Sequence, residues 1–261
     1  AASLEPLAAD ADEADRFVPA VRSVLRESGL ARYTVPAAYG GRDERVDSLA
    51  ITVIRESLAE VSSHADSMLA MQGIGSFALA LGGSDELRER WLPRVAQLDP
   101  VAALALTEPS VGSDLRALST TIEPDGDELV VTGHKSFITN APDADFFCVL
   151  GRDGDGYSMA LVPADTPGVT VTQPHQVISP HVLGDVVLDG VRVPADHRIG
   201  EPGTAFGLVL RTLGTFRVSV AGAGIGIAKG ALREALAYAQ GRELFGTTLS
   251  KLGAVPETLA R

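Results

Sequence analysis

The sequence predicts an α+β fold in which a β-rich middle segment lies between two helical segments. Apolar residues recur at helical spacing up to about residue 100. Short β-type runs then follow up to about residue 200, separated by clusters of glycine, proline and aspartate, and helical spacing returns near Ala205. We therefore divide the chain into an N-terminal helical domain (1–100), a middle β-domain (101–201) and a C-terminal helical segment (202–261).

Three helical segments are expected before the β-domain. The first ends at Gly29, because glycine favours the left-handed conformation that closes helices. The third begins after Ser84, whose hydroxyl is placed to cap the first free backbone amides. The apolar positions that set the helical spacing in the three segments are Val18, Val21, Leu25, Leu49, Val53, Leu58, Val61, Leu87, Trp91 and Val95.

The middle segment is typical of a β-domain. Its runs are six to ten residues long, rich in β-branched residues, and bounded by turn residues. They read ELVVTG, DFFCVLG, YSMALVP, GVTVTQ and DVVLDGVRVP. Several short strands joined by tight turns predict an antiparallel barrel or sandwich.

The C-terminal segment predicts a long helix rich in small residues. One apolar stripe consists of Ala221, Ile225, Ala228, Leu232, Leu236 and Ala239. Four glycines, at positions 222, 224, 226 and 230, superficially suggest a dinucleotide-binding loop. They miss the GxGxxG spacing and lie within a helical pattern, so we interpret them as sites of close helix packing.

Composition excludes several classes of function. The 261 residues are 45% hydrophobic, which is enough for a substantial core. A net charge of −12 repels nucleic acid and anionic lipid, so we expect neither as a partner. The single cysteine, Cys148, lies in an apolar run and is more typical of a buried structural thiol than of a nucleophile. No apolar run approaches membrane-spanning length and no signal peptide is apparent, so we expect a soluble, cytoplasmic protein.

The histidines do not predict a metal site. They lack the paired spacing of metal ligands, and we expect ordinary surface or core roles for them. The five are His64, His134, His175, His181 and His197.

Two blocks inside the β-domain are the most informative part of the sequence. Ala105–Asp114 reads ALTEPSVGSD, and Gly133–Asn140 reads GHKSFITN. Either block alone is also compatible with ordinary turns between strands. Three further blocks occur in order, VPAAYGG at Val35–Gly41, VRVP at Val191–Pro194 and YAQGRELFG at Tyr238–Gly246. With all five, the chain resembles the acyl-CoA dehydrogenase family of flavoproteins over essentially its whole length, and this resemblance implies FAD as cofactor and an incomplete C-terminal helical domain.

The first block suits a flavin site. A flavin ring is flat and hydrogen-bonds along its edge, so its site needs backbone amides and short hydroxyls in a loop that can approach closely. Leu106, Thr107, Gly112 and Ser113 suit that task. The resemblance implies that Thr107 faces the pyrimidine edge. It places Ser113 near the pyrophosphate and the acyl-thioester channel, as a cofactor and substrate contact.

The second block and the last one complete the expected cofactor site. The resemblance implies that Phe137 packs on the flavin ring and that the Thr139 hydroxyl lies by N5, the hydride acceptor, with Ile138 between them. Arg242 resembles the family arginine that reaches across a subunit interface to the FAD pyrophosphate, and Phe245 accompanies it. Outside that context, Arg242 would be interpreted as a solvated helix charge.

The catalytic base is not identifiable in the sequence. The family reaction removes the α-proton of an acyl thioester while the β-hydrogen leaves as hydride to the flavin, and the base is a carboxylate in an apolar pocket. Some members place it just before the arginine of the long helix, but here Phe216 precedes Arg217. Phenylalanine cannot act as a base, whereas Arg217 remains a candidate for substrate binding. The usual position in the last helices would lie beyond Arg261.

Other departures from the family pattern affect the substrate side. Gly214 and Gly253 stand where members commonly carry an acid and a glutamine, and Ile178–Gly184 lacks the usual Arg-x-Ser pattern. The substrate carrier can therefore be either coenzyme A or an acyl-carrier protein.

Three functions remain open. The first is an FAD-dependent acyl-thioester dehydrogenase, the second is oxygenase or oxidase chemistry on the same fold, and the third is a non-catalytic subunit that completes a neighbour's FAD site. A homo-dimer or homo-tetramer is expected if Arg242 acts in trans. An electron-transfer flavoprotein is a possible electron acceptor.

Overall fold

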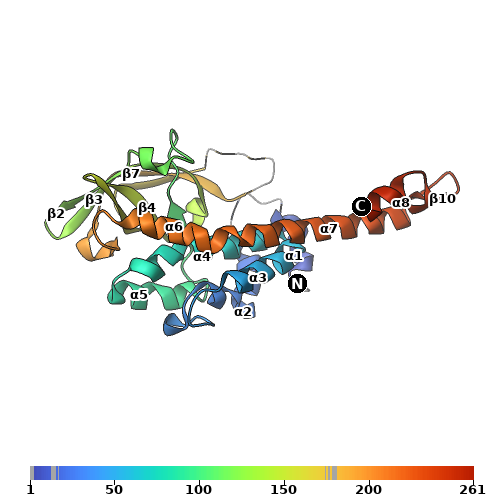
Figure 1. Ribbon diagram of the computed structural model, residues 1–261, viewed down its shortest axis with the longest axis horizontal. Coiled ribbons are helices and arrows are strands. Elements are labelled where there is room, and N and C mark those ends of the chain that lie inside the picture. The colour runs from blue at the N-terminus through green and yellow to red at the C-terminus, as the bar shows by residue number, and fades with distance from the viewer. Residues whose placement is uncertain (1–2, 13–15, 17, 174, 176, 178–180) are drawn as a thin grey trace.

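The computed structural model describes residues 3–12, 16, 18–173, 175, 177 and 181–261. Helices lie at both ends of the sequence and a sheet lies between them, as predicted (Figure 1). The N-terminal helices are α1 (Glu5–Asp12), α2 (Pro19–Ser28), α3 (Ser48–Ala59), α4 (Ser63–Gly82) and α5 (Asp85–Val95). Short 3₁₀ turns at Leu30–Thr34 and Ala37–Tyr39 join α2 to α3.

The predicted helix ends are confirmed by their local geometry. Helix α2 closes at Gly29, which has a φ of 68°. Helix α5 begins after Ser84, whose hydroxyl accepts a hydrogen bond from the amide of Leu87 at 3.2 Å. The stripe assigned to α3 is only partly buried, because Leu49 and Val53 are 69% and 55% exposed.

Helix α4 is the central helix of the N-terminal region, and its apolar pattern gives no amphipathic signal. Most of its residues are buried, because it contacts helices on one side and the sheet on the other. Gly75 allows close approach to the sheet, since a Cβ there would lie 2.7 Å from the carbonyl carbon of Ala102. Gln72 accepts from the amide of Ala102 at 3.0 Å and donates to the carbonyl of Pro100 at 2.7 Å. These bonds fix the first strand against α4.

The sheet has eight strands in the order β6-β7-β3-β2-β4-β5-β8, with β1 paired to β4 beside this path. Their bounds are β1 (Ala102–Ala105), β2 (Thr121–Asp125), β3 (Glu128–Thr139), β4 (Phe146–Asp153), β5 (Gly156–Pro163), β6 (Val169–Thr172), β7 (Leu183–Pro194) and β8 (Arg198–Ile199). The expected purely antiparallel sheet is mixed, because β1 and β2 both run parallel to β4. Both pairings come from long crossovers, which the pattern of short runs does not reveal.

Strand β4 lies between two apolar cores. Phe146, Cys148 and Leu150 belong to the core shared with the helices, and Phe147 and Val149 to the core on the opposite face of the sheet. Burial on both faces explains why this segment is a continuous apolar run. Burial also raises the pKa of the Cys148 thiol to about 12, as expected for a structural thiol.

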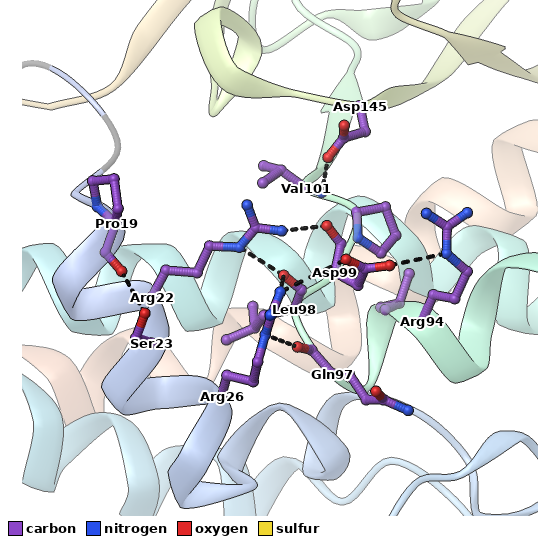
Figure 2. Close-up of polar contacts among 12 residues, drawn as sticks. Pro19, Arg22, Ser23, Arg26, Arg94, Gln97, Leu98, Asp99, Val101 and Asp145 are labelled. Carbon is purple, nitrogen blue, oxygen red and sulfur yellow. Dashed lines mark hydrogen bonds and ion pairs between the residues drawn. The ribbon is translucent and has the colours of Figure 1, made fainter.

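Two arginines of α2 hold the junction between the helices and the sheet (Figure 2). Arg22 donates from Nε to the carbonyl of Leu98 at 2.7 Å and from Nη2 to the carbonyl of Asp99. Arg26 donates from Nε to the carbonyl of Gln97 at 3.0 Å. Leu98 has a φ of 53°, a conformation that L-residues rarely adopt. The arginines thus satisfy the carbonyls of a strained turn that leads into β1.

The C-terminal helices are α6 (Ala205–Arg217), α7 (Ser219–Gly241) and α8 (Val255–Ala260), with a hairpin of β9 (Glu243–Leu244) and β10 (Thr247–Thr248) before α8. Helix α7 packs on α3 and then extends along the long axis, so that its hairpin lies at the end opposite the sheet (Figure 1). We call residues 234–261, beyond the ion pair of Arg233 with Glu60 at the end of α3, the arm.

Three of the four glycines in α7 serve close helix packing. A Cβ at Gly222, Gly226 or Gly230 would lie 2.2–2.5 Å from a carbonyl oxygen of α3 or of its C-cap residue Glu60, whereas Gly224 faces open space. The predicted apolar stripe is therefore not the face that packs on α3. Its members are exposed apart from Ala239. The close helix packing predicted at the glycines is confirmed for Gly222, Gly226 and Gly230.

The stretch Ala205–Gly241 also corrects the expectation about apolar length. It is long and apolar enough to cross a membrane, with a mean hydropathy of 1.2 in its best window, of which 33% is buried. Its glycines interrupt any continuous apolar run, which is why the sequence pattern did not indicate it. Length and composition alone are weak evidence of a membrane span, because core helices of soluble proteins meet the same criteria.

Candidate functional site

A recess of about 120 Å³ lies where α4, β1 and β3 meet. The two informative blocks of the sequence converge there, although 18 residues of chain lie between them. The recess is lined by Met71, Ile74, Leu104, Leu106, Thr107, Phe137, Ile138 and Thr139. Five of the predicted cofactor residues, two from the first block and three from the second, are therefore neighbours in the structure.

A bulge in β3 presents Phe137 to the recess. The pairing of β3 with β7 shifts register between Lys135 and Ile138, so the intervening residues leave the regular ladder. Phe137 adopts a φ of 56°, and its side chain is 53% exposed. An exposed aromatic ring on a strained backbone is typical of a functional surface.

The buried Glu108 carboxylate holds the first block in place by hydrogen bonds. Its carboxylate accepts from the amide and hydroxyl of Ser119, both at 2.7 Å, and from the amide and hydroxyl of Thr120, at 2.9 and 2.6 Å. Burial alone would raise the pKa of Glu108, but these four hydrogen bonds outweigh it and lower the pKa to about 2. The loop is therefore organised around a group that is charged at neutral pH.

Lys135 joins the two blocks. Its ammonium group is fully buried and donates to Glu108 Oε1 and to the carbonyl of Leu106, both at 3.0 Å. Burial lowers the pKa of Lys135, and the Glu108 carboxylate opposes that effect. The backbone amide of Ser136 adds a bond to the carbonyl of Thr107 at 2.9 Å. Together, the bonds to Thr107 and to its two neighbours fix the position of Thr107 relative to β3.

A second polar cluster lies behind Phe137. Asp185 of β7 contacts Ser136 Oγ at 2.7 Å, His175 Nε2 at 2.6 Å and His134 Nε2 at 3.0 Å. Burial alone would raise the pKa of Asp185, but these three hydrogen bonds outweigh it and hold the pKa at about 2. The His175 ring stacks on Phe137, with centroids 3.9 Å apart and planes inclined by 18°.

The Thr139 hydroxyl lies at the other edge of the recess. It is 3.4 Å from His181 Nε2, and the Ser67 hydroxyl of α4 lies 3.5 Å from the same ring. The departure predicted at Ile178–Gly184 lies partly outside the described residues, which omit 178–180.

The remaining predicted residues lie away from the recess. Gly112 and Ser113 are exposed in the loop that forms the last part of the first block. Arg217, at the end of α6, is exposed, and the preceding Phe216 is buried edge-to-face against Phe77. In the described part of the chain, Phe216 therefore faces an apolar core and not a reacting group.

Arg242 and Phe245 belong to the arm. Arg242 ends α7, and the Phe245 side chain is 92% exposed at the tip of the β9–β10 hairpin. The hairpin that follows Arg242 and carries Phe245 lies at the far end of α7 from the sheet (Figure 1). The arrangement does not bring them to the recess of their own chain.

Glu108, Lys135 and Asp185 were not among the predicted site residues, and His175 was expected to have an ordinary surface or core role. Glu108 and Lys135 lie inside the two informative blocks, where a charged residue among apolar neighbours was an available signal. The contact of His175 and Asp185 depends on the path between β6 and β7, and no spacing rule indicates it. Groups of three or more residues able to hold a metal ion are not found among the described residues.

Comparison with protein families agrees with this geometry. Models described as the acyl-CoA dehydrogenase N-terminal, middle and C-terminal domains match residues 1–99, 103–191 and 204–261. A cyclohexane-1-carbonyl-CoA dehydrogenase of Syntrophus aciditrophicus is 32% identical over 98% of this chain and 68% of its own length. The chain belongs to the acyl-CoA dehydrogenase family. Members of this family are oxidoreductases that act on CH–CH groups and use FAD.

Other members of the family extend this likeness. The mitochondrial short-chain specific acyl-CoA dehydrogenase of Bos taurus is 32% identical over 98% of the chain and 64% of its own length. A glutaryl-CoA dehydrogenase of Mycobacterium smegmatis in complex with FADH2 superposes with a TM-score of 0.89 at 30% identity, covering 98% of this chain and 66% of its own. The chain spans about two thirds of the length of the relatives it matches.

Proposed function

We propose that this chain forms the flavin-binding part of an FAD-dependent dehydrogenase that introduces an α,β double bond into an acyl thioester. The convergence of the two sequence blocks on one recess carries the proposal. Leu106 and Thr107 reach the recess from the loop after β1, and Phe137, Ile138 and Thr139 reach it from the end of β3. Family membership supplies the class of reaction.

The recess fits one edge of a flat ring. Its walls are mainly apolar, and its polar side chains are the hydroxyls of Thr107 and Thr139. A volume of about 120 Å³ admits part of a ring system and not a whole dinucleotide, so the rest of the cofactor would extend over the exposed loop at Gly112 and Ser113. A bound flavin supplies the hydride acceptor. The residues of this chain orient it and shield one side from water.

The base is proposed to come from outside residues 1–261. The described residues that line the recess include no acid, and the buried Phe216 cannot accept a proton. A carboxylate from a further helical segment would complete the site. In that arrangement Arg217, which is exposed at the end of α6, is a candidate contact for the substrate carrier.

The remaining parts of the proposal concern partners. The substrate is an acyl-CoA or acyl-carrier-protein thioester, and an electron-transfer flavoprotein is a possible electron acceptor. Arg242 and Phe245 would serve the FAD of a second copy in a dimer or tetramer, because the arm carries them away from their own recess. A cytoplasmic location is part of the same proposal.

Oxidase chemistry is the second candidate. A crystal structure of the prolyl acyl carrier protein oxidase AnaB superposes with a TM-score of 0.81 at 26% identity, covering 94% of this chain and 68% of its own. The fold therefore also occurs in a protein described as an oxidase. Assays under air separate the two functions. An enoyl product that depends on an added electron acceptor supports a dehydrogenase, whereas oxygen consumption with formation of peroxide supports an oxidase.

A visible absorption spectrum of the purified full-length protein tests the flavin site. We expect a flavin spectrum that bleaches when a suitable acyl thioester is added under anaerobic conditions. Thr139→Val removes only the hydroxyl at the recess and should weaken FAD binding about three- to ten-fold, as the loss of one hydrogen bond predicts. Thr132→Val, at an exposed position of the same strand, is the control. A protein without flavin, or equal FAD affinity in both variants, would contradict the assignment.

A further inference from the structure

One face of the Phe137 ring is covered by an imidazole. The His175 ring stacks on Phe137 at a centroid distance of 3.9 Å, nearly parallel to it. Phe137 is still 53% exposed, and it lines the recess, whereas His175 does not. The phenyl ring is thus held between a histidine and the space assigned to the flavin.

His175 is itself fixed by hydrogen bonds. Its Nε2 donates to Asp185 Oδ1 at 2.6 Å, and Asp185 is only 9% exposed. Ser136 donates to the same oxygen, and Ser136 immediately precedes Phe137 in the bulge of β3. One carboxylate therefore controls both the backbone next to Phe137 and the ring stacked upon it.

The cluster is not a hydrolytic triad, although it contains serine, histidine and aspartate. In a triad, the histidine uses one ring nitrogen for the serine and the other for the carboxylate. Here His175 Nε2 is the atom nearest to both Ser136 Oγ, at 3.3 Å, and Asp185. The serine hydroxyl already donates a hydrogen bond to Asp185, and Ser136 is only 3% exposed. The geometry favours positioning over nucleophilic attack.

We propose that His175, anchored by Asp185, is a positioning residue that holds the Phe137 ring against the bound flavin. This inference rests on the proposed flavin site. Phe137 has a strained φ of 56°, a conformation that persists only where surrounding contacts hold it. Stacking by His175 restricts the motion of the Phe137 ring before the cofactor binds. Such preorganisation raises the affinity for the cofactor.

Three variants of the full-length protein test this role. His175→Ala removes the stack and the bond to Asp185, and His175→Phe keeps an aromatic ring but not that bond. His134→Gln is the matched control, because His134 also donates to Asp185 but its ring is not stacked on Phe137 in the described structure. The measurements are the dissociation constant for FAD, the visible circular dichroism of the bound flavin, and the Tm of each apoprotein.

We expect His175→Ala to weaken FAD binding about three- to ten-fold, the value of one aromatic contact, and to alter the visible circular dichroism. His175→Phe should recover most of the affinity, and His134→Gln should match the wild type. Wild-type protein that binds FAD together with unchanged affinity and dichroism in His175→Ala would overturn the inference alone. Equal losses in His175→Ala and His134→Gln would also overturn it, because they would assign the effect to Asp185. Wild-type protein that binds no FAD would instead overturn the proposed function.

Discussion

The recess and the arm are held in opposite ways by their own chain. Around the recess, Glu108 and Asp185 are buried carboxylates, each surrounded by several donors. In the arm, Phe245 is 92% exposed, and the Arg242 guanidinium makes no hydrogen bond or ion pair within the described residues. The recess is preorganised by contacts within the chain, whereas the arm presents these two side chains to solvent. The comparison indicates which residues act on stability and which act on assembly.

Removing Glu108 should have the largest effect. Glu108→Ala leaves the buried Lys135 ammonium without its counter-charge and the donors of Ser119 and Thr120 without their acceptor. We expect the free energy of unfolding to fall by about 3–5 kcal/mol, measured by chemical denaturation. Glu123→Ala, on the exposed face of β2, should change it by less than about 0.5 kcal/mol. Similar values for both variants would show that the recess is not organised around Glu108.

Acid should weaken the recess region in a defined window. The pKa of Glu108 falls from 4.5 to about 2 on folding, so its contribution is complete above pH 4.5 and is lost as the pH decreases toward 2. At about 1.4 kcal/mol per pKa unit, the loss is about 3 kcal/mol. Denaturation curves across this range should show a smaller pH dependence in Glu108→Gln than in the wild type. Parallel curves would contradict the depressed pKa.

The contact that supports the arm can be tested at its glycines. A Cβ at Gly226 would lie 2.2 Å from the carbonyl oxygen of Glu56, so Gly226→Ala must separate α7 from α3. We expect a loss of about 1–3 kcal/mol in thermal or chemical unfolding. Gly224 has nothing within 4 Å of its Cβ position, and Gly224→Ala should be neutral or stabilising by up to about 1 kcal/mol. Equal effects at both positions would argue against close packing.

Arg242→Ala should have the smallest effect on stability. The exposed guanidinium lacks partners in the described chain, so the free energy of unfolding should change by less than about 0.5 kcal/mol. If Arg242 binds the FAD of a second copy, the same variant should lose flavin on dilution at least about ten-fold more readily than the wild type, as measured by ultrafiltration. If Arg242→Ala clearly lowers the free energy of unfolding but leaves flavin retention unchanged, Arg242 acts on stability and not on assembly, contrary to the comparison.

The features that were predictable from the sequence are those encoded by local chemistry. Gly29 and Ser84 mark helix ends because a left-handed glycine and a capping hydroxyl act on their immediate neighbours. The α+β order was predictable because the period of apolar residues differs between helix and strand. The grouping of Thr107 with Thr139 was predicted only through the family resemblance.

The features that were not predicted depend on contacts distant in the sequence. Helix α4 is buried on most sides, so it lacks the polar face by which helices are recognised. The parallel pairing of β1 with β4 depends on a crossover of some 40 residues. The stack of His175 on Phe137 joins two segments through β7, and neither segment carries a signal for the other.

The backbone at Phe137 restricts which amino acids this position can accept. With a φ of 56°, valine, isoleucine and threonine would clash with their own backbone, because a branched Cβ has no room in that conformation. Glycine would relieve the strain but would remove the ring that faces the recess. Natural variation at this position should therefore be confined to unbranched aromatic side chains. The strained backbone of the bulge and the flat ring of a bound flavin would then favour the same few residues at this position for separate reasons.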